Sequence, residues 1–218
     1  KPLSWEAGSS LSWEYEDQKW LQGVIDMTTM TSFQSITGKS MAMVMEEKLL
    51  PGSNPALTLV PSMGLEVTFA NNTITQFTGS AKARLEEWAE GVLTIDGVAG
   101  PTSFNGDMVG KLVGQRDIEG SELSLIGGGN VSIDVNQNRA TKIKGDVPFI
   151  WGANDWFQGL AHVSESSALR NINGPFESGS VRVDNKDFGG GFKLLGGGSM
   201  TGDLVNNDIQ KVAGDMNF

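Results

Sequence analysis

A short stretch of this sequence recurs twice further along the chain, and this repetition limits the folds that the chain can adopt. The three segments are residues 66–79 (EVTFANNTITQFTG), 132–145 (SIDVNQNRATKIKG) and 201–214 (TGDLVNNDIQKVAG). Each has two short apolar runs, a polar pair containing asparagine between them, and a final glycine. The polar pairs are Asn71-Asn72, Gln137-Asn138 and Asn206-Asn207. This pattern predicts a β-hairpin, because asparagine tolerates the positive φ that tight hairpin turns need.

Composition agrees with a chain of many short strands. Of the 218 residues, 29 are glycine and 39% are hydrophobic, which fits tight turns and excludes a disordered chain. The formal net charge of −10, without any basic cluster, argues against a nucleic acid or an anionic membrane as the partner. The absence of cysteine excludes a disulfide scaffold and a thiolate metal site. No apolar stretch has the length of a transmembrane helix, so we expect no transmembrane segment in this chain.

The first 61 residues differ in texture from the rest. Residues 11–16 and 20–30 predict two strands around a polar turn. Residues 39–48 (KSMAMVMEEK) alternate methionine on one face with Ala42 and Val44 on the other, which predicts a third strand. The densest proline cluster of the sequence follows at residues 50–61. We therefore predict a small β-rich handle over residues 1–61 and a second domain over residues 62–218.

The second domain repeats an order of short strands. After the first hairpin we predict strands at residues 81–88 and 92–96, and after the second hairpin at residues 147–151 and 156–163, so that Trp88 aligns with Trp156. Residues 80–90 have some helical character, but their alternation favours a strand. About six strands in each of two units, with a third hairpin at the end, predict an all-β fold. We expect an antiparallel β-barrel of about eight strands, or a closely packed sandwich, since closure removes exposed edges.

Few residues suit catalysis or metal binding. The one histidine, His162, is most simply a polar residue on a strand face, and the alternative is an axial ligand of haem or of a metal ion. It has no G-x-S-x-G elbow beside it, and a typical zinc site would need several carboxylates as well. Glu86 and Glu87 point to opposite faces of a strand and cannot form a catalytic pair alone. We expect no catalytic residue, no metal site and no resident cofactor, with haem left open.

Tryptophan and methionine side chains offer a candidate contact surface. Trp88 and Trp156 are expected in the core because they hold equivalent positions. Core packing is also the simpler interpretation of the aromatic and methionine residues in the first 61, but such side chains can adapt to a partner as well. The predicted partner-binding residues are Trp5, Trp13, Trp20, Met41, Met43, Met45 and His162.

Several pieces of the sequence share one family pattern. These are residues 67–79, the W-x-x-G of residues 88–91, the F-x-G-x-x-x-G of residues 104–110, and the closing residues 202–218. Together they resemble the C-terminal barrel of transferrin-binding-protein-B-like bacterial surface lipoproteins. In the closing piece Gly202, Leu204, Val212 and Gly214 fit the family pattern, whereas Asn206, Ile209, Ala213 and Met216 depart from it.

The resemblance implies a handle of a few strands beside an eight-stranded barrel. It also implies a protein of the outer membrane, the cell surface or the secreted fraction of a Gram-negative bacterium, exported by an outer-membrane translocator. Its partner would be a host protein or haem, or it would act in host colonisation. The leading hypothesis is therefore an exported, non-enzymatic binding protein.

The alternative is a carbohydrate-binding or carbohydrate-active β-sandwich that uses tryptophan and carboxylate side chains. A row of exposed tryptophans beside two facing carboxylates would favour this alternative. Tryptophans buried between strands would oppose it.

Overall fold

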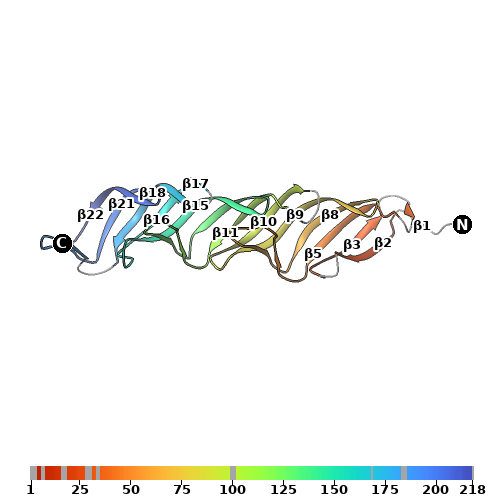
Figure 1. Ribbon diagram of the computed structural model, residues 1–218, viewed down its shortest axis with the longest axis horizontal. Helices are drawn as coiled ribbons and strands as arrows, with labels where there is room; N and C mark the ends of the chain where they lie inside the picture. Colours follow the sequence, from red (N-terminus) through yellow and green to blue (C-terminus); the bar gives the residue numbers. More distant parts are fainter. Residues whose placement is uncertain are drawn as a thin grey trace. The chain divides into compact units, whose positions relative to one another are not determined.

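The computed structural model describes residues 4–5, 8–15, 19–27, 31–32, 35–98, 102–167, 169–182 and 186–217 (Figure 1). Strands make up 68% of the structure, and no helix is found among the described residues. The predicted all-β, antiparallel fold is confirmed. The predicted barrel of about eight strands is not confirmed, because the antiparallel sheet is larger, with 17 strands, and is not closed.

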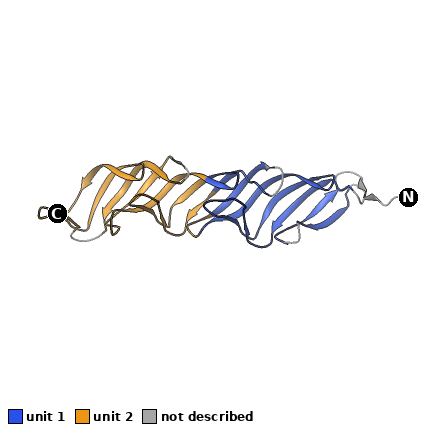
Figure 2. Cartoon of the chain, viewed as in Figure 1, with its two compact units in different colours: residues 1–86, 91–108, 134–140 blue, residues 87–90, 109–133, 141–218 orange. Residues whose placement is uncertain are grey.

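The chain divides into two compact units (Figure 2). The first comprises residues 1–86, 91–108 and 134–140. The strands that lie in it, wholly or in part, are β1 (Ser4–Trp5), β2 (Ser10–Glu14), β3 (Leu21–Met27), β4 (Thr31–Ser32), β5 (Gly38–Val44), β6 (Lys48–Leu49), β7 (Leu57–Leu59), β8 (Ser62–Ala70), β9 (Thr73–Leu85), β10 (Ala89–Val98) and β11 (Gly106–Leu112).

The second unit comprises residues 87–90, 109–133 and 141–218. Its strands, wholly or in part, are β12 (Arg116–Asp117), β13 (Leu123–Leu125), β14 (Asn130–Asn136), β15 (Arg139–Trp151), β16 (Phe157–Val163), β17 (Glu165–Ser167), β18 (Asn171–Val181), β19 (Lys186–Gly189), β20 (Phe192–Leu194), β21 (Gly197–Val205) and β22 (Asp208–Asp215).

One long strand organises each unit. In the first unit β9 has 13 residues, and one of its edges pairs with two strands in succession, first β8 and then β7. In the second unit β15 also has 13 residues; the end of one edge pairs with β13, and the other edge pairs with β16. Residues 80–85 belong to β9, so the predicted strand in this stretch is confirmed.

The three predicted hairpins are confirmed as β8–β9, β14–β15 and β21–β22. All six residues of their turns have positive φ, between 48° and 69°. Positive φ at both central residues is the type I′ turn, whose twist matches that of the flanking strands. The local conformational tolerance of asparagine therefore explains why the hairpins turn where they do.

The second turn residue of each hairpin also makes a specific pair of hydrogen bonds. The Oδ1 atoms of Asn72, Asn138 and Asn207 accept the backbone N–H groups of Ile36 (2.7 Å), Phe104 (2.6 Å) and Ile172 (2.6 Å). The backbone N–H of each asparagine donates in return to the carbonyl oxygen of the same residue, at 3.0, 2.9 and 3.2 Å. We call this pair of bonds the asparagine latch. It fastens each hairpin turn to a segment about 35 residues upstream, as in the spacing of 34 between Phe104 and Asn138.

Each hairpin also needs the glycine that ends its sequence motif. Gly79, Gly145 and Gly214 have φ values of 100°, 122° and 142°. A Cβ atom at these positions would lie only 2.1 to 2.3 Å from a carbonyl oxygen of the neighbouring strand. Glycine is therefore required both by the backbone conformation and by the close approach of the paired strand.

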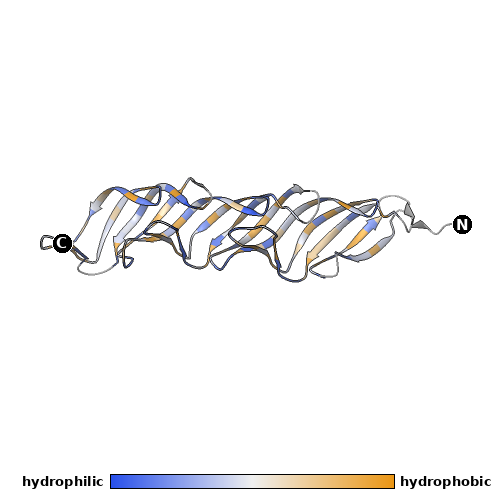
Figure 3. Ribbon diagram, viewed as in Figure 1, coloured by the Kyte–Doolittle hydropathy of each residue, from blue (hydrophilic) through white to orange (hydrophobic). Residues whose placement is uncertain are grey.

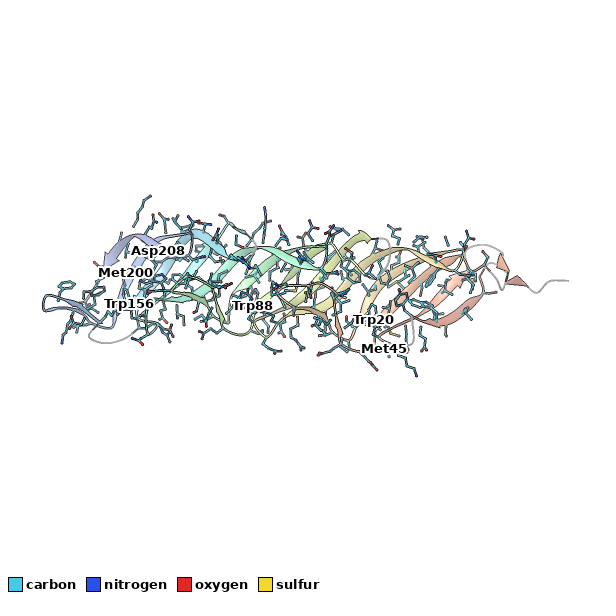
Figure 4. The ribbon with its side chains drawn as sticks, in the orientation of Figure 1. Trp20, Met45, Trp88, Trp156, Met200 and Asp208 are labelled. Atoms are coloured by element: carbon cyan, nitrogen blue, oxygen red, sulfur yellow. The ribbon has the colours of Figure 1, made fainter. Side chains whose placement is uncertain are left out.

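The repeating order extends upstream of the proline cluster. Trp20, Trp88 and Trp156 stand immediately before β3, β10 and β16, at intervals of 68 residues (Figure 4). A cationic side chain lies over each of these rings. The three cations are Lys48 (5.4 Å from the ring centroid), Arg116 (4.8 Å) and Lys186 (5.3 Å), the first residues of β6, β12 and β19.

The strand register carries the same interval. Trp13 of β2 lies opposite Gly23 of β3, and Phe149 of β15 lies opposite Gly159 of β16, 136 residues or two intervals later. We therefore distinguish three repeats: repeat 1 (residues 20–87), repeat 2 (residues 88–155) and repeat 3 (residues 156–217). Repeat 1 begins inside the predicted handle, and β7 and β8, on either side of residue 61, lie in the same unit. The predicted domain division at residue 61 itself stays a prediction.

The core follows from alternation along the strands. In β5 the residues at positions 38, 40, 42 and 44 are buried and those between them are exposed. β3 and β13 also alternate in burial, and Figure 3 shows hydrophobic and hydrophilic residues alternating along the strands. The inner face of β9 ends in fully buried side chains, with Phe77 packed edge to face against Phe104 at 5.9 Å between ring centroids.

Loss of one latch should destabilise the protein. In Asn138→Ala the Phe104 N–H loses its acceptor, the carbonyl oxygens of Thr102 and Pro51 lose a donor, and the turn loses a residue that tolerates positive φ. Asn138 is buried, so we expect the free energy of unfolding to fall by about 2–4 kcal/mol, measured by urea denaturation. The control Asn136→Ala changes an exposed residue of β14 and should alter it by less than about 0.5 kcal/mol. Equal effects of the two substitutions would contradict the role of the latch.

Candidate functional site

The methionines of β5 face the solvent. Met41 is 62% exposed, Met43 is 37% exposed, and Met45, which follows the strand, is 44% exposed (Figure 4 labels Met45). Ala42 and Val44, on the other face, are 1% and 2% exposed. The predicted alternation is confirmed, and the interpretation of these methionines as core side chains is wrong. The small side chains of β5 fill the core, and the large flexible ones lie outside.

Strand pairing extends this exposed face to the two neighbouring strands. Met41 lies opposite Val24 of β3, and Met43 lies opposite Met63 of β8. Val24 is 49% exposed and Met63 is 75% exposed. We call Val24, Met41, Met43 and Met63 the methionine surface. Contiguous exposed apolar side chains of this kind mark interaction sites more often than isolated ones do.

Charged residues border the methionine surface. Lys39 precedes Met41 by two residues and forms an ion pair with Glu66 of β8 at 3.7 Å. On the other neighbouring strand Asp26 lies opposite Lys39. These groups are exposed, so their pairing contributes little to stability. They leave an apolar surface with a mixed but accessible charged rim.

The same outer positions differ between the repeats. Two intervals of 68 residues lead from Met41 to Val109 and then to Glu177. Val109 is as exposed as Met41, at 62%, and Glu177 is also exposed. The outer face is therefore methionine-rich in repeat 1, aliphatic at this position in repeat 2 and charged in repeat 3.

The predicted tryptophans do not join the methionine surface. Trp20 is 2% exposed, so it packs in the core. Trp13 is half-buried, donates its Nε1–H to the hydroxyl of buried Ser40 at 2.7 Å, and lies edge-on to Phe69 at 5.0 Å. The side chain of Trp5 lies outside the described residues. Trp88, at 3% exposure, confirms the prediction of a core residue, and Trp156 is half-buried.

Two residues of the methionine surface, Val24 and Met63, were missing from the sequence prediction. Only the pairing of β5 with β3 and β8 brings them beside Met41 and Met43. A local signal did exist for Val24, which alternates with Leu21, Gln22, Gly23 and Ile25 in a period-two pattern. The pattern alone does not say which face of the strand is outside.

His162 lies on the outer face of the second unit, between two carboxylates. Its Nδ1 is 2.7 Å from Oδ1 of Asp146 on β15, and its Nε2 is 3.1 Å from Oε1 of Glu177 on β18. These bonds, that with Asp146 first, raise the pKa of His162 above its ordinary value. Its neighbours Ala161 and Val163 are buried, so the imidazole points away from the core.

This geometry supports the simpler interpretation of His162 as a polar residue on a strand face. Both ring nitrogens already contact a carboxylate oxygen, and neither is left for an axial bond to haem iron. Within the part of the chain that the structure describes, no group of three or more histidine, cysteine, aspartate or glutamate residues could hold a metal ion. A helix capable of crossing a membrane is likewise not found among these residues.

Comparisons with protein-family models, with curated proteins and with solved structures found no match to this chain. The candidate site therefore rests on the geometry above.

The charge state of His162 can be measured directly, since it is the only histidine. We expect its imidazole pKa, followed by NMR titration, to lie above the ordinary value of about 6.5 and to fall in Asp146→Asn. The control Asp107→Asn removes an exposed carboxylate of β11 and should leave the pKa unchanged. A pKa that does not respond to Asp146→Asn would contradict the bond seen in the structure.

The same shift sets a pH dependence of stability. Because the folded-state pKa is raised, the stabilisation is fully present below the unfolded-state pKa and is lost as the pH rises through the folded-state pKa. The difference in unfolding free energy between the wild type and His162→Gln should therefore be larger at about pH 5 than at about pH 9. A difference that grows with pH would have the wrong sign.

Proposed function

We propose that this chain is a non-enzymatic binding protein that recognises a partner protein through the methionine surface. The observation that carries the proposal is the alignment of four exposed apolar side chains across β3, β5 and β8. Three of them are methionines, whose flexible and polarisable side chains adapt to the shape of a partner. The β5 backbone beneath them is held in a sheet, so the surface is presented on a rigid element.

The chemistry of the surface specifies the partner. An apolar contact area on a chain of net charge −10 fits a protein that exposes aliphatic or aromatic side chains flanked by lysine or arginine. Long-range attraction between opposite charges speeds the encounter, and the buried methionines supply most of the affinity. Such binding weakens as ionic strength rises, because salt screens the exposed charges.

The resemblance to transferrin-binding-protein-B-like surface lipoproteins supports a wider form of the proposal. In that form the protein is exported by an outer-membrane translocator to a Gram-negative cell surface, and its partner is a host protein. The family's eight-stranded barrel is not part of the support, since the sheet described above is larger and not closed.

The two other candidates gain less from the geometry. A carbohydrate site of the expected kind needs a row of exposed tryptophans beside facing carboxylates, whereas Trp20 and Trp88 are buried and Trp13 is bonded on the inner face. A haem site built on His162 would require the imidazole to give up one of its two carboxylate partners.

The test is a matched pair of substitutions on the outer face. Met41→Asp with Met63→Asp places two charges in the methionine surface, whereas Val109→Asp places a charge at the equivalent and equally exposed position of repeat 2. Proteins captured from host serum on the immobilised wild type are identified by mass spectrometry, and their affinities are measured by biolayer interferometry. We expect the double variant to lose at least about tenfold in affinity and Val109→Asp to bind like the wild type.

Two results would contradict the proposal. One is capture of the same proteins, with the same affinity, by the double variant. The other is an affinity that rises with salt concentration, which would exclude a basic partner.

A further inference from the structure

Repeat 3 lacks the cover that repeats 1 and 2 receive. In the first unit the inner face of β9 is covered by the repeat that follows it, as the packing of Phe77 against Phe104 shows. In the second unit β15 is covered in the same way, and its Ile143 N–H donates to the Ser166 hydroxyl at 2.8 Å. No following repeat covers β22 within the part of the chain that the structure describes.

Equivalent positions show the difference directly. Val212 of β22 lies two residues before the hairpin glycine, as do Phe77 and Ile143 in the earlier repeats. Phe77 and Ile143 are both 0% exposed, and Val212 is 43% exposed. Two residues after the same glycines, Ala81 and Val147 are buried, and Met216 is 37% exposed. Val212 and Met216 are therefore core side chains without their cover.

An apolar cavity of about 480 Å³ opens at this place. The ten residues that line it are all apolar or aromatic: Trp151, Trp156, Phe157, Phe188, Phe192, Leu194, Met200, Ile209, Val212 and Met216. Phe192, the first residue of β20, is 50% exposed, while the first residues of β7 and β13, Leu57 and Leu123, are buried. The last three residues of β9 and β15 pair with β7 and β13, whereas β20 pairs only with β19 among the described residues.

The start of the chain carries the matching surface. Within the molecule, β9 and β15 are covered by the beginning of the next repeat, namely β10 or β16 and the segment around Phe104 or Ile172. The equivalent elements of repeat 1 are β3 and the segment around Ile36. Phe104 and Ile172 are 0% exposed, whereas Ile36 is only half-buried.

The strands that cover β3 are also shorter than those at the internal joints. β3 pairs with β2, which has five residues, where β16 pairs with a strand of 13 residues. The only other described strand upstream is β1, which makes a two-residue pairing with β4. The beginning of repeat 1 is thus under-covered, and the end of repeat 3 is uncovered.

We infer that the end of repeat 3 is a docking site for repeat 1 of a second copy of this chain. β22 of one copy takes the place of β1 and β2 beside β3 of the other, and the two repeats join as repeats 1 and 2 join within the chain. Val212 then packs against the Ile36 segment as Phe77 packs against Phe104. The two surfaces differ, so each docked copy leaves one of each free, and the assembly is head-to-tail and open-ended.

The inference does not rest on the proposed function, since it uses other residues. It is tested by sedimentation velocity of the full chain over a range of concentrations. We expect the weight-average mass of the wild type to rise with concentration from that of one 23.3 kDa chain towards at least twice that value. Val212→Asp should stay at the mass of one chain, and Val109→Asp, an equally drastic change elsewhere, should behave like the wild type. A wild type that stays monomeric at every soluble concentration would overturn the inference.

A second measurement tests the register without disturbing the core. In the internal joint Asp146 lies opposite His162, and the corresponding residues of the docked copies are Asp215 and Asp26. The chain has no cysteine, so Asp215→Cys and Asp26→Cys can be mixed and oxidised without background thiols. We expect a disulfide-linked dimer of the two different variants, several-fold more abundant than in a control mixture of Asp107→Cys with Asp26→Cys. Equal yields in the two mixtures would refute this docking geometry.

Discussion

The asparagine latch is the interaction on which the rest of the structure depends. It joins a hairpin turn, which has a backbone conformation that few residues tolerate, to a segment far upstream in the same repeat. That segment holds Phe104 in repeat 2, and the Phe104 ring packs on Phe77 of the preceding repeat. A polar contact within one repeat therefore positions the apolar contact between repeats. A buried amide that lost these bonds would cost about 1–3 kcal/mol for each unsatisfied group, so the latch also selects this one arrangement.

The two faces of the strands obey different constraints. Inner positions have to fill a close-packed core, so positions such as 77 and 143 carry large apolar side chains that are fully buried. Outer positions are free of that requirement, and the series Met41, Val109 and Glu177 shows how far they diverge along one chain. A binding surface can therefore be placed on one repeat without disturbing the fold that all three share.

Local chemistry explains what the sequence could predict. The hairpins were predicted because asparagine at positive φ and a glycine at each close approach leave a mark in the sequence itself. The interval of 68 residues was found only from β9 onward, since Trp20 has no neighbouring residue in common with Trp88 or Trp156 apart from the cation that folding brings over its ring. Closure of a sheet is a property of its distant edges, and the predicted barrel failed for that reason.

The methionine surface shows the same limit at the level of single residues. Alternation in residues 39–48 separates two faces, but both faces are apolar, and the pattern does not say which one meets the core. Ala42 and Val44 are inside because the facing strands leave room only for small side chains there, as the close approach of Gly23 to the Met41 carbonyl and the Ser40 hydroxyl indicates. This packing is made by residues from different strands and cannot be read from β5 alone.

Comparison between repeats distinguishes two kinds of exposed apolar residue in this molecule. Met41 is exposed, and so is its counterpart Val109, so the position belongs to the outer face in both repeats. Val212 is exposed, but its counterparts Phe77 and Ile143 are fully buried, so its exposure reflects a missing neighbour. In an array of repeats much of the stability comes from the contacts between neighbours, and an end without a polar cap retains that unused contact energy. The first kind of surface is therefore suited to a foreign partner of variable shape, and the second is suited to another repeat of the same design.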